Sequence, residues 1–406
     1  MAAMGAPAAA EHARAGRPTV GIVGAGQLAR MCAQAAISLD VGVRLLAESP
    51  LDGAAQVTPG AIIGSPFDPA ALARLAEACD VMTFDHELVA ADAVAALEAR
   101  GTVARPPARA LAIAQDKLAQ RGMLAGLGLP QPAFRPLEGD RLAERMADAA
   151  AEWGWPVVVK SARGGYDGRG VWFVEGPEAA ADLADRLGDA GPVLVEEHVA
   201  LESELAAVVV RRPGGETVTY PVVGMVMSEG ICRELTVPAS VPNEVAADAI
   251  RYVGAVAAAV DVVGILALEL FRTADGLLCN EIAVRPHNSA HFTLGGCVTS
   301  QFENHLRAVL DLPLGDTSAV APAIATVNVI AADRADERVA TERLTAALAV
   351  PGVAVHRYGK EPRPGRKVGH VTALGTDPAE VRARARAAAA ILAGEEPATA
   401  GRTVAA

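Results

Sequence analysis

The sequence predicts a protein of the α/β and α+β classes, with an N-terminal parallel sheet followed by mainly antiparallel sheets. Three observations lead to this prediction. Strand-like and helix-like segments alternate over residues 19–116, which is typical of an open parallel sheet. A glycine-rich segment, residues 164–170, lies between two apolar strands. A later pair of apolar strands is joined by Asp275-Gly276, a dipeptide that favours a hairpin turn.

Composition narrows the possible functions. A chain of 406 residues with 51% hydrophobic residues can form two to four domains with a large core. The net charge of −12 argues against a nucleic-acid partner, because phosphate binding needs a basic surface. The five cysteines are scattered and lack the spacing of a zinc site or a disulfide framework.

Two further features of the sequence predict where in the cell the protein is found. The sequence contains no run of about 18 apolar residues, so it predicts no membrane-spanning helix. The first 18 residues are rich in Ala, Gly and Pro and lack the pattern of a signal peptide. We therefore expect a cytoplasmic protein without a membrane partner, with a disordered tail at residues 1–18 and a further tail at 395–406.

The first predicted strand, Thr19–Val23, runs into a glycine turn and a helix that extends to about Leu39. The turn reads G-A-G-Q-L-A over residues 24–29, and such a turn places backbone N–H groups where an anion can bind. With Glu48 about twenty residues further on, the pattern also matches a dinucleotide site. A dinucleotide-dependent oxidoreductase is therefore one interpretation, although the same turn occurs in folds that bind no dinucleotide.

A second polar group follows the third predicted strand, Val81–Phe84. Asp85, His86 and Glu87 come at its carboxyl end, where ligands bind in open α/β sheets. An exposed acidic loop is the alternative. A long helix is predicted over residues 108–127, and the first domain boundary is placed near Asp116.

The glycine-rich segment begins the next part of the chain. A predicted strand over residues 156–161 carries Lys160, and the segment G-G-Y-D-G-R-G follows at 164–170. Its glycines allow the backbone to lie against phosphates, and Lys160 and Arg169 add positive charge. A flexible hairpin loop without a ligand is the alternative. Further on, Glu196, Glu197, His198 and Glu204 lie at strand ends, where they could accept from adenine and ribose or remain solvated.

The predicted hairpin of residues 264–283 carries one carboxylate on each strand. Glu269 and Glu281 would be neighbours, and Mg²⁺ prefers one or two carboxylates together with substrate phosphates. A cluster of polar side chains comes directly after the hairpin: Arg285, His287, Asn288, Ser289 and His291. The cluster predicts a site at a strand end, whereas the alternative is a charged surface hairpin.

A basic turn lies near the end of the chain. Lys360, Arg363, Arg366 and Lys367 place four cations in an acidic protein, which favours an anion site over a solvated face. Strand and helix alternate on both sides of this turn, up to a helix predicted over residues 378–393.

Together these motifs resemble the N5-carboxyaminoimidazole ribonucleotide synthase family of ATP-grasp ligases, which act in purine biosynthesis. The resemblance covers about residues 19–393. It rests on the order and spacing of five motifs: G-x-G-Q-L at 24–28, I-A-Q-D-K at 113–117, G-G-Y-D-G-R-G at 164–170, N-E-I-A-x-R-P-H-N-S-x-H at 280–291 and R-P-G-R-K-x-G-H at 363–370.

The resemblance implies an ATP-grasp fold of three lobes between two tails, with ATP bound between the last two lobes. The tails are 1–18 and 395–406, the Rossmann-like parallel-sheet domain is 19–116, the small lid is 117–204, and the C-terminal domain with the basic turn is 205–394. The implied reaction converts ATP, bicarbonate and 5-aminoimidazole ribonucleotide to N5-carboxyaminoimidazole ribonucleotide, ADP and phosphate. The resemblance also implies a homodimer and a functional link to the mutase that acts on the product.

The resemblance further implies roles for individual residues. Residues implied to bind ATP are Lys117, Lys160, Gly165, Tyr166, Asp167, Gly168, Arg169, Gly170, Val171, Glu196, Glu197, His198, Val199, Glu204, Asn280 and Glu281. Glu269 and Glu281 are implied to hold Mg²⁺, with Mn²⁺ as a substitute. Residues implied to bind the ribonucleotide are Gln27, Leu28, Glu87, Lys360, Arg366 and Lys367. The implied catalytic residues are Tyr166, Asp167, Arg285, His287 and Asn288.

The chain departs from the family pattern at a few positions. Residues 83–88 read T-F-D-H-E-L where T-x-E-x-E-N is common, so only Glu87 carries over directly. Met227 stands where some members have a nucleotide-contacting His, and Val171 replaces a common Gln. Ala283 stands where many other ATP-grasp enzymes have a metal-binding Asn, a substitution that is usual in this family. The alternatives are another ATP-grasp ligase, either glycinamide ribonucleotide transformylase-like or biotin carboxylase-like, and a non-catalytic nucleotide-binding subunit.

Overall fold

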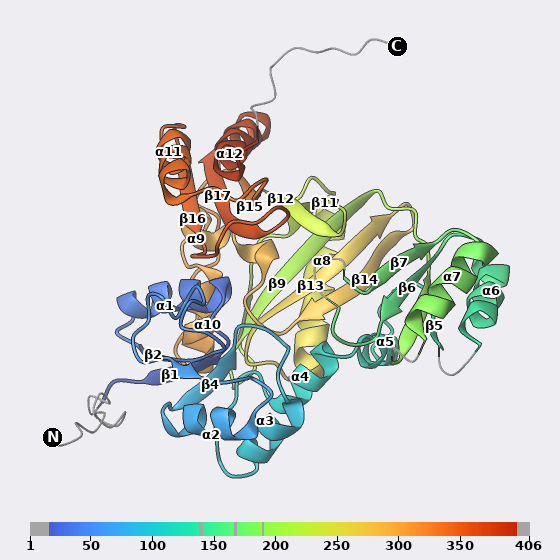
Figure 1. Cartoon of the computed structure of the whole chain (residues 1–406), viewed down its shortest axis with the longest axis horizontal. Helices are drawn as coiled ribbons and strands as arrows, with labels where there is room; N and C mark the ends of the chain where they lie inside the picture. The colour runs from blue at the N-terminus through green and yellow to red at the C-terminus, as the bar shows by residue number, and fades with distance from the viewer. Residues whose placement is uncertain (1–15, 138–140, 166–168, 189–190, 396–406) are drawn as a thin grey trace.

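The computed structural model describes residues 16–137, 141–165, 169–188 and 191–395, and it contains three separate sheets (Figure 1). The tails predicted for residues 1–18 and 395–406 fall almost entirely outside the described residues. In the described part of the chain, no helix combines the length and the apolar character needed to cross a membrane.

The N-terminal sheet is parallel throughout, in the order β3-β2-β1-β4, as the sequence predicts. Its strands are β1 (Thr19–Val23), β2 (Gly42–Ala47), β3 (Ile62–Ile63) and β4 (Val81–Phe84). The helices of this part are α1 (Gln27–Ser38), α2 (Pro69–Glu77), α3 (Ala91–Glu98) and α4 (Ala108–Ala114). The strands are apolar and mostly buried. Because they are parallel, the carboxyl ends of β1, β2 and β4 meet at one edge of the sheet.

The prediction of a single helix over residues 108–127 is wrong. The structure has two helices instead, because α4 ends at Ala114 and α5 (Lys117–Gly126) begins separately. Asp116 adopts extended backbone angles, and its carboxylate accepts hydrogen bonds from the N–H groups of Leu118 and Ala119. An Asp in this position caps a helix by satisfying backbone donors that have no partner within the helix. The cap places Lys117 at the first position of α5.

The small lid forms its own four-stranded antiparallel sheet in the order β5-β8-β6-β7. Its elements are β5 (Phe134–Leu137), α6 (Leu142–Trp153), β6 (Val157–Ser161), β7 (Val171–Val174), α7 (Pro177–Leu187) and β8 (Val193–Glu197). Alternate residues of β6 face opposite sides, as in any strand. Val157 and Val159 pack into the core shared with α6 and α7, whereas Val158 and Lys160 line a cavity.

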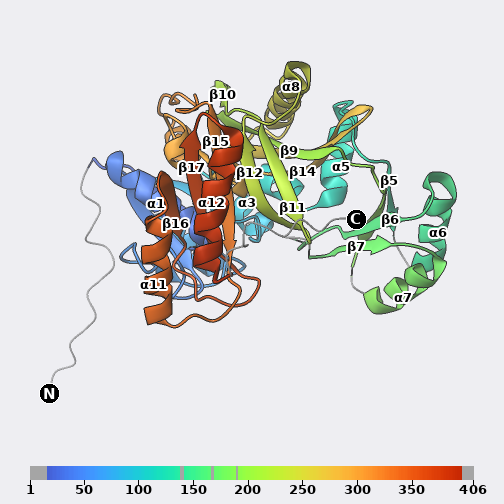
Figure 2. The ribbon, with the colours of Figure 1, turned by 90° about the horizontal axis from the view of Figure 1, so that it is seen from above.

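The third sheet has nine strands and continues from the middle of the chain to its end. Its strands are β9 (Ser203–Arg211), β10 (Thr217–Thr219), β11 (Val223–Ser228), β12 (Ile231–Val237), β13 (Gly264–Thr273), β14 (Gly276–Ala283), β15 (Ala323–Ile330), β16 (Val353–Arg357) and β17 (Lys367–Gly375). Helix α8 (Asn243–Ala259) packs on β9, β13 and β14, and α12 (Pro378–Ala393) packs on β15 and β17. Helix α11 (Glu337–Leu348) packs beside α12. Viewed from above, the pair α11–α12 and the lid lie at opposite ends of this sheet (Figure 2).

Helix α10 (Gln301–Val309) connects the N-terminal sheet to the central sheet. It packs against α1 on one side and against β13 and β9 on the other. The buried ring of His305 accepts a hydrogen bond from Ile265 N–H at Nδ1 (3.2 Å), so its Nε2–H donates to Thr83 Oγ1 (2.8 Å). One neutral imidazole therefore holds β4 and β13 in a fixed relation.

Candidate active site

A single cavity of about 1780 Å³ lies where the three sheets meet. Its walls come from the carboxyl ends of β1, β2 and β4, from β6 and β8 of the lid, from the β13–β14 hairpin, and from the turn before β17. The described residues with an implied binding or catalytic role all line this cavity, except Arg169 and Gly170. Ser289 and His291 of the predicted polar cluster are buried and do not line it. Tyr166, Asp167 and Gly168 lie outside the described residues.

The β13–β14 hairpin brings its two carboxylates together as predicted. Glu269 and Glu281 are directly paired across the antiparallel ladder, and a bulge follows Glu269. Burial, and then the charges of Glu281 and Glu204, raise the pKa of the Glu269 carboxyl from 4.5 to about 7. Two neighbouring carboxylates that repel each other in this way are suited to bind a cation. Among the described residues, no group of three or more His, Cys, Asp or Glu side chains is arranged to hold a metal ion by itself.

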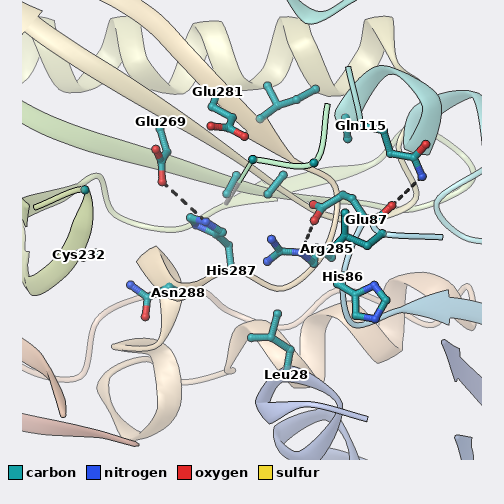
Figure 3. A pocket seen from close by; sticks show the side chains of 18 of the residues that line it. Leu28, His86, Glu87, Gln115, Cys232, Glu269, Glu281, Arg285, His287 and Asn288 are labelled. Atoms are coloured by element: carbon teal, nitrogen blue, oxygen red, sulfur yellow. Dashed lines mark hydrogen bonds and ion pairs between the residues drawn. The ribbon is translucent and has the colours of Figure 1, made fainter. Parts of the chain in front are cut away.

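His287 faces this carboxylate pair from the segment after β14 (Figure 3). Its Nε2 lies 3.7 Å from Glu269 Oε1, and its Nδ1 accepts from Ser289 N–H at 3.3 Å. Burial, and then the charges of Arg285 and Lys367, lower the pKa of the His287 imidazole to about 3. The ring is therefore neutral, with its proton on Nε2, and presents an N–H donor to the cavity.

Arg285 joins the central sheet to the N-terminal sheet. Its Nε donates to Glu87 Oε2 at 2.6 Å, and this carboxylate follows β4 (Figure 3). Burial favours the neutral form of Arg285, but the charge of Glu87 outweighs it and raises the pKa of the guanidinium. The Gln115 amide donates to the carbonyls of Glu87 (2.6 Å) and Val89 (2.8 Å), so the loop after β4 is held from behind.

A buried charge cluster lies between the lid and the central sheet. Glu196 of β8 accepts from Lys160 Nζ at 2.7 Å and from Arg121 at 2.6 Å. Burial raises the pKa of Glu196, but Lys160 and then Arg121 outweigh that effect and lower it. Burial lowers the pKa of Lys160, against the attraction of Glu196. Lys160 Nζ also donates to Asn280 Oδ1 at 3.1 Å, so the two predicted ATP contacts lie side by side.

A second ion pair joins Lys117, at the start of α5, to Glu281 Oε1 at 2.7 Å. Gly165 lines the cavity next to this pair. A Cβ on Gly165 would lie only 2.8 Å from the carbonyl of Arg169, so the two ends of the glycine loop close tightly on each other. The loop therefore begins and ends beside the predicted phosphate contacts.

The anion position at the start of α1 is filled by the protein itself. The Asp85 carboxylate accepts hydrogen bonds from Gly26 N–H and from Ala29 N–H, the latter at 3.0 Å. A Cβ on Gly26 would lie 2.7 Å from Asp85 Oδ2, so glycine is required for this approach. A dinucleotide pyrophosphate would need the place that Asp85 occupies. This arrangement argues against the oxidoreductase interpretation.

The basic turn lies against the N-terminal sheet although it is distant in sequence. The Gln56 amide donates to the carbonyl of Gly359 at 2.7 Å. Arg366 Nη1 donates to the carbonyl of Glu361 at 3.1 Å, which shapes the turn from within. Lys360, Arg363, Arg366 and Lys367 all line the cavity.

Some residues of the site were not found by sequence reasoning. Arg121, Gln115 and Gln301 each hold a site residue from behind, and Phe271 and Cys232 line the cavity wall. Their only local signals are a helical pattern and a strand pattern, which do not reveal partners far along the chain.

Comparisons with known proteins agree with this geometry. Three family models match in order: a ribonucleotide synthetase preATP-grasp domain over residues 18–115, an ATP-grasp domain over 122–302, and a phosphoribosylaminoimidazole carboxylase C-terminal domain over 325–384. The N5-carboxyaminoimidazole ribonucleotide synthase of Mycobacterium tuberculosis is 48% identical over 380 residues, which cover 92% of this chain and 87% of that protein. The chain belongs to the N5-carboxyaminoimidazole ribonucleotide synthase family.

Solved structures of this family have the same fold. The synthetase of Thermus thermophilus has 36% identity and a TM-score of 0.82, covering 93% of this chain and 99% of that one. The synthase of Aspergillus clavatus in complex with ADP and the aminoimidazole ribonucleotide has 29% identity and a TM-score of 0.85, covering 93% and 98%. The ATP-grasp fold of three lobes that the sequence predicts is therefore confirmed.

Proposed function

We propose that this chain carboxylates 5-aminoimidazole ribonucleotide on its exocyclic amine, using bicarbonate and ATP, through a carboxyphosphate intermediate. One observation carries the proposal. A single cavity contains the paired carboxylates Glu269 and Glu281, the Arg285–Asn288 segment and the basic turn. In our assignment, a phosphoryl-transfer site and a cationic ribonucleotide site share this cavity.

The ATP half of the site is assigned to the interface of the lid and the hairpin. Lys160 and Lys117 are cations suited to phosphate oxygens, and Gly164 and Gly165 of the glycine loop line the cavity with them. Protein groups accelerate phosphoryl transfer mainly by position and charge stabilisation. In our assignment the Glu196–Val199 strand end lines the adenine and Glu204 contacts the ribose.

The metal position is assigned to Glu269 and Glu281, with ATP phosphates as further ligands. Mg²⁺ binds through one or two carboxylates together with phosphate oxygens and water, and the two paired carboxylates suit that pattern. The raised pKa of Glu269 supports the assignment, because a divalent cation would offset the burial, and then the repulsion between carboxylates, that raise it. The ion, when bound, would neutralise charge on the transferring phosphoryl group; Mn²⁺ has similar ligand preferences.

The ribonucleotide half is assigned to the N-terminal sheet, Arg285 and the basic turn. The 5′-phosphate needs cations, and Arg366 can bind phosphate in bidentate fashion, whereas Lys360 and Lys367 act as point charges. A bicarbonate oxygen attacks the γ-phosphorus of ATP, giving ADP and carboxyphosphate. Loss of phosphate releases CO₂, to which the amine adds with loss of one proton. His287 is neutral, and we assign it as a hydrogen-bond donor to the carboxyphosphate.

The proposal is tested by ADP release from purified protein with ATP, Mg²⁺ and bicarbonate, with and without the aminoimidazole ribonucleotide. We expect the ribonucleotide to stimulate ADP release strongly. Stimulation by formate plus glycinamide ribonucleotide, or by biotin, would instead assign one of the other ATP-grasp reactions. The finer expectations of a cytoplasmic homodimer, and of a mutase that consumes the labile product, rest on the family resemblance. Light scattering at several protein concentrations tests the homodimer.

A further inference from the structure

Gln301, the first residue of α10, makes contacts that the proposed mechanism does not use. Its side chain is 0% exposed. Its Oε1 accepts from His287 N–H at 2.8 Å, and its Nε2 donates to His287 C=O at 2.8 Å. A buried amide without partners is costly, whereas here one carboxamide pairs both backbone groups of a single residue. Two hydrogen bonds with Gln301 therefore hold the backbone of His287, whose carbonyl also accepts from Ala290 N–H at 3.1 Å.

The same side chain also fixes a second histidine. Gln301 Nε2 lies 3.2 Å from His291 Nδ1, and an amide NH₂ can only donate. His291 Nδ1 must therefore accept, which keeps this buried ring neutral with its proton on Nε2. The backbone N–H of Gln301 donates to Thr293 Oγ1 at 2.9 Å, and Thr293 donates to the carbonyl of Ala290 at 2.7 Å. The segment from His287 to Thr293 is thus fastened to the start of α10.

Helix α10 is itself held in position by contacts with both neighbouring sheets. His305, one turn further along, bridges Thr83 and Ile265, and a Cβ on Gly264 would lie 2.7 Å from its Nδ1. Ser300 caps the helix by accepting from Glu303 N–H. Gln301 therefore relates the backbone of His287 to a helix that contacts both the N-terminal and the central sheet. The His287 ring projects from this backbone to within 3.7 Å of Glu269.

We propose that Gln301 is a positioning residue for the carboxylation. It sets the position and orientation of His287 relative to the Glu269–Glu281 pair, and through His287 those of the Arg285–Asn288 segment. The inference rests on the proposed function for its activity readout. A displacement of about 1 Å in a reacting group can lower a rate about 100-fold. Loss of a supporting contact behind a site residue typically lowers activity about 10- to 100-fold.

Two variants separate positioning from stability. Gln301→Met keeps the side-chain length and loses every side-chain hydrogen bond. Gln301→Glu keeps the acceptor for His287 N–H, but the ionised carboxylate faces the His287 carbonyl and His291 Nδ1 without a proton to donate. Asn304→Asp is the matched control, because Asn304 is an equally buried amide on the same helix. Its partners are Tyr220 and Gly315, which lie outside the cavity lining.

Steady-state kinetics per folded molecule give the first readout. We expect both Gln301 variants to lower kcat by about 10- to 100-fold, with the KM for ATP within about twofold of wild type. Relative to wild type at each pH, Gln301→Glu recovers as the pH falls, because a protonated carboxyl regains a donor. Asn304→Asp loses thermal stability but keeps kcat within about twofold. An equal fall of kcat in the Gln301 and Asn304 variants, or wild-type kcat in Gln301→Met, overturns the proposal.

A second readout does not need catalysis. In ¹⁵N-histidine NMR, assigned with a His287→Asn variant, Gln301→Met shifts the ring signals of His287 and His291, whereas Asn304→Asp leaves them in place. Unchanged His287 signals in Gln301→Met refute the positioning role even if the wild-type protein proves inactive with the ribonucleotide. Inactive wild type with shifted signals refutes the proposed function and leaves the positioning of His287 supported.

Discussion

Replacement of Arg121 by Met tests whether the buried charge cluster holds the lid interface together. The Arg121 guanidinium is 2% exposed and contacts Glu196 Oε1 at 2.6 Å through Nη2 and 2.8 Å through Nε. Its Nη1 donates to the carbonyl of Cys279 at 2.9 Å. Met retains most of the apolar stem but leaves Glu196 with Lys160 as its only remaining cation in the cluster.

The expected loss of stability can be worked from these contacts. Removing one partner of a buried ion pair costs about 3–5 kcal/mol, because the other charge stays buried. Lys160 still contacts the second oxygen of Glu196 at 2.7 Å, so we expect a value near the lower end, about 3 kcal/mol. Lys160 would then be held more tightly by Glu196, and ATP binding would weaken as well.

The assay is urea unfolding followed by fluorescence, with Arg145→Met as the control. Arg145 is an exposed Arg on α6, so its change should stay within about 0.5 kcal/mol. The Arg121→Met, Glu196→Gln double variant should be less destabilised than the sum of its single variants, because the pair is lost only once. A loss below about 1 kcal/mol for Arg121→Met, or strict additivity, refutes the reasoning.

Three further predictions address the metal, the substrate phosphate and acid stability. Glu281→Gln should lower kcat at least about 100-fold with unchanged unfolding, and near-normal turnover at saturating Mg²⁺ would remove this residue from the site. Arg366→Ala and Lys367→Ala should each raise the KM for the ribonucleotide about 10- to 100-fold and leave that for ATP within about twofold; an equal rise in both constants contradicts the phosphate assignment. The pKa of His305 is lowered by burial from 6.5 to about 3, so the unfolded chain binds a proton between these values while the folded protein does not. Stability should therefore fall as the pH drops below 6.5, by about 2 kcal/mol at pH 5 from this group, and urea unfolding of His305→Gln should lack that part of the slope.

Local signals were sufficient for the hairpin to which we assign the metal and phosphate site. The Asp275-Gly276 turn set the hairpin, and alternation along each strand then placed Glu269 opposite Glu281, as the structure confirms. The order and spacing of the motifs also carried the family resemblance, and Gly164, Gly165, the hairpin and the basic turn line one cavity. The hairpin pairing depends on residues close together in the sequence.

Other features depend on contacts that a single sequence does not reveal. The break before Lys117 lies within a continuous helical pattern, and only the side-chain cap of Asp116 shows it. Arg121 and Gln301 resemble ordinary polar helix residues, yet their partners lie 75 and 14 positions away. The glycine turn before α1 predicted an anion, but the anion is the carboxylate of Asp85, 59 residues from Gly26.

The fate of labelled bicarbonate tests the central claim most directly. Purified protein is incubated with ATP, Mg²⁺, the aminoimidazole ribonucleotide and ¹⁴C-bicarbonate, and label bound to the ribonucleotide is compared with ADP formed. The account predicts acid-labile label on the ribonucleotide in a one-to-one ratio to ADP, and none without ATP. ADP released in the presence of the ribonucleotide without any label on it would contradict the account.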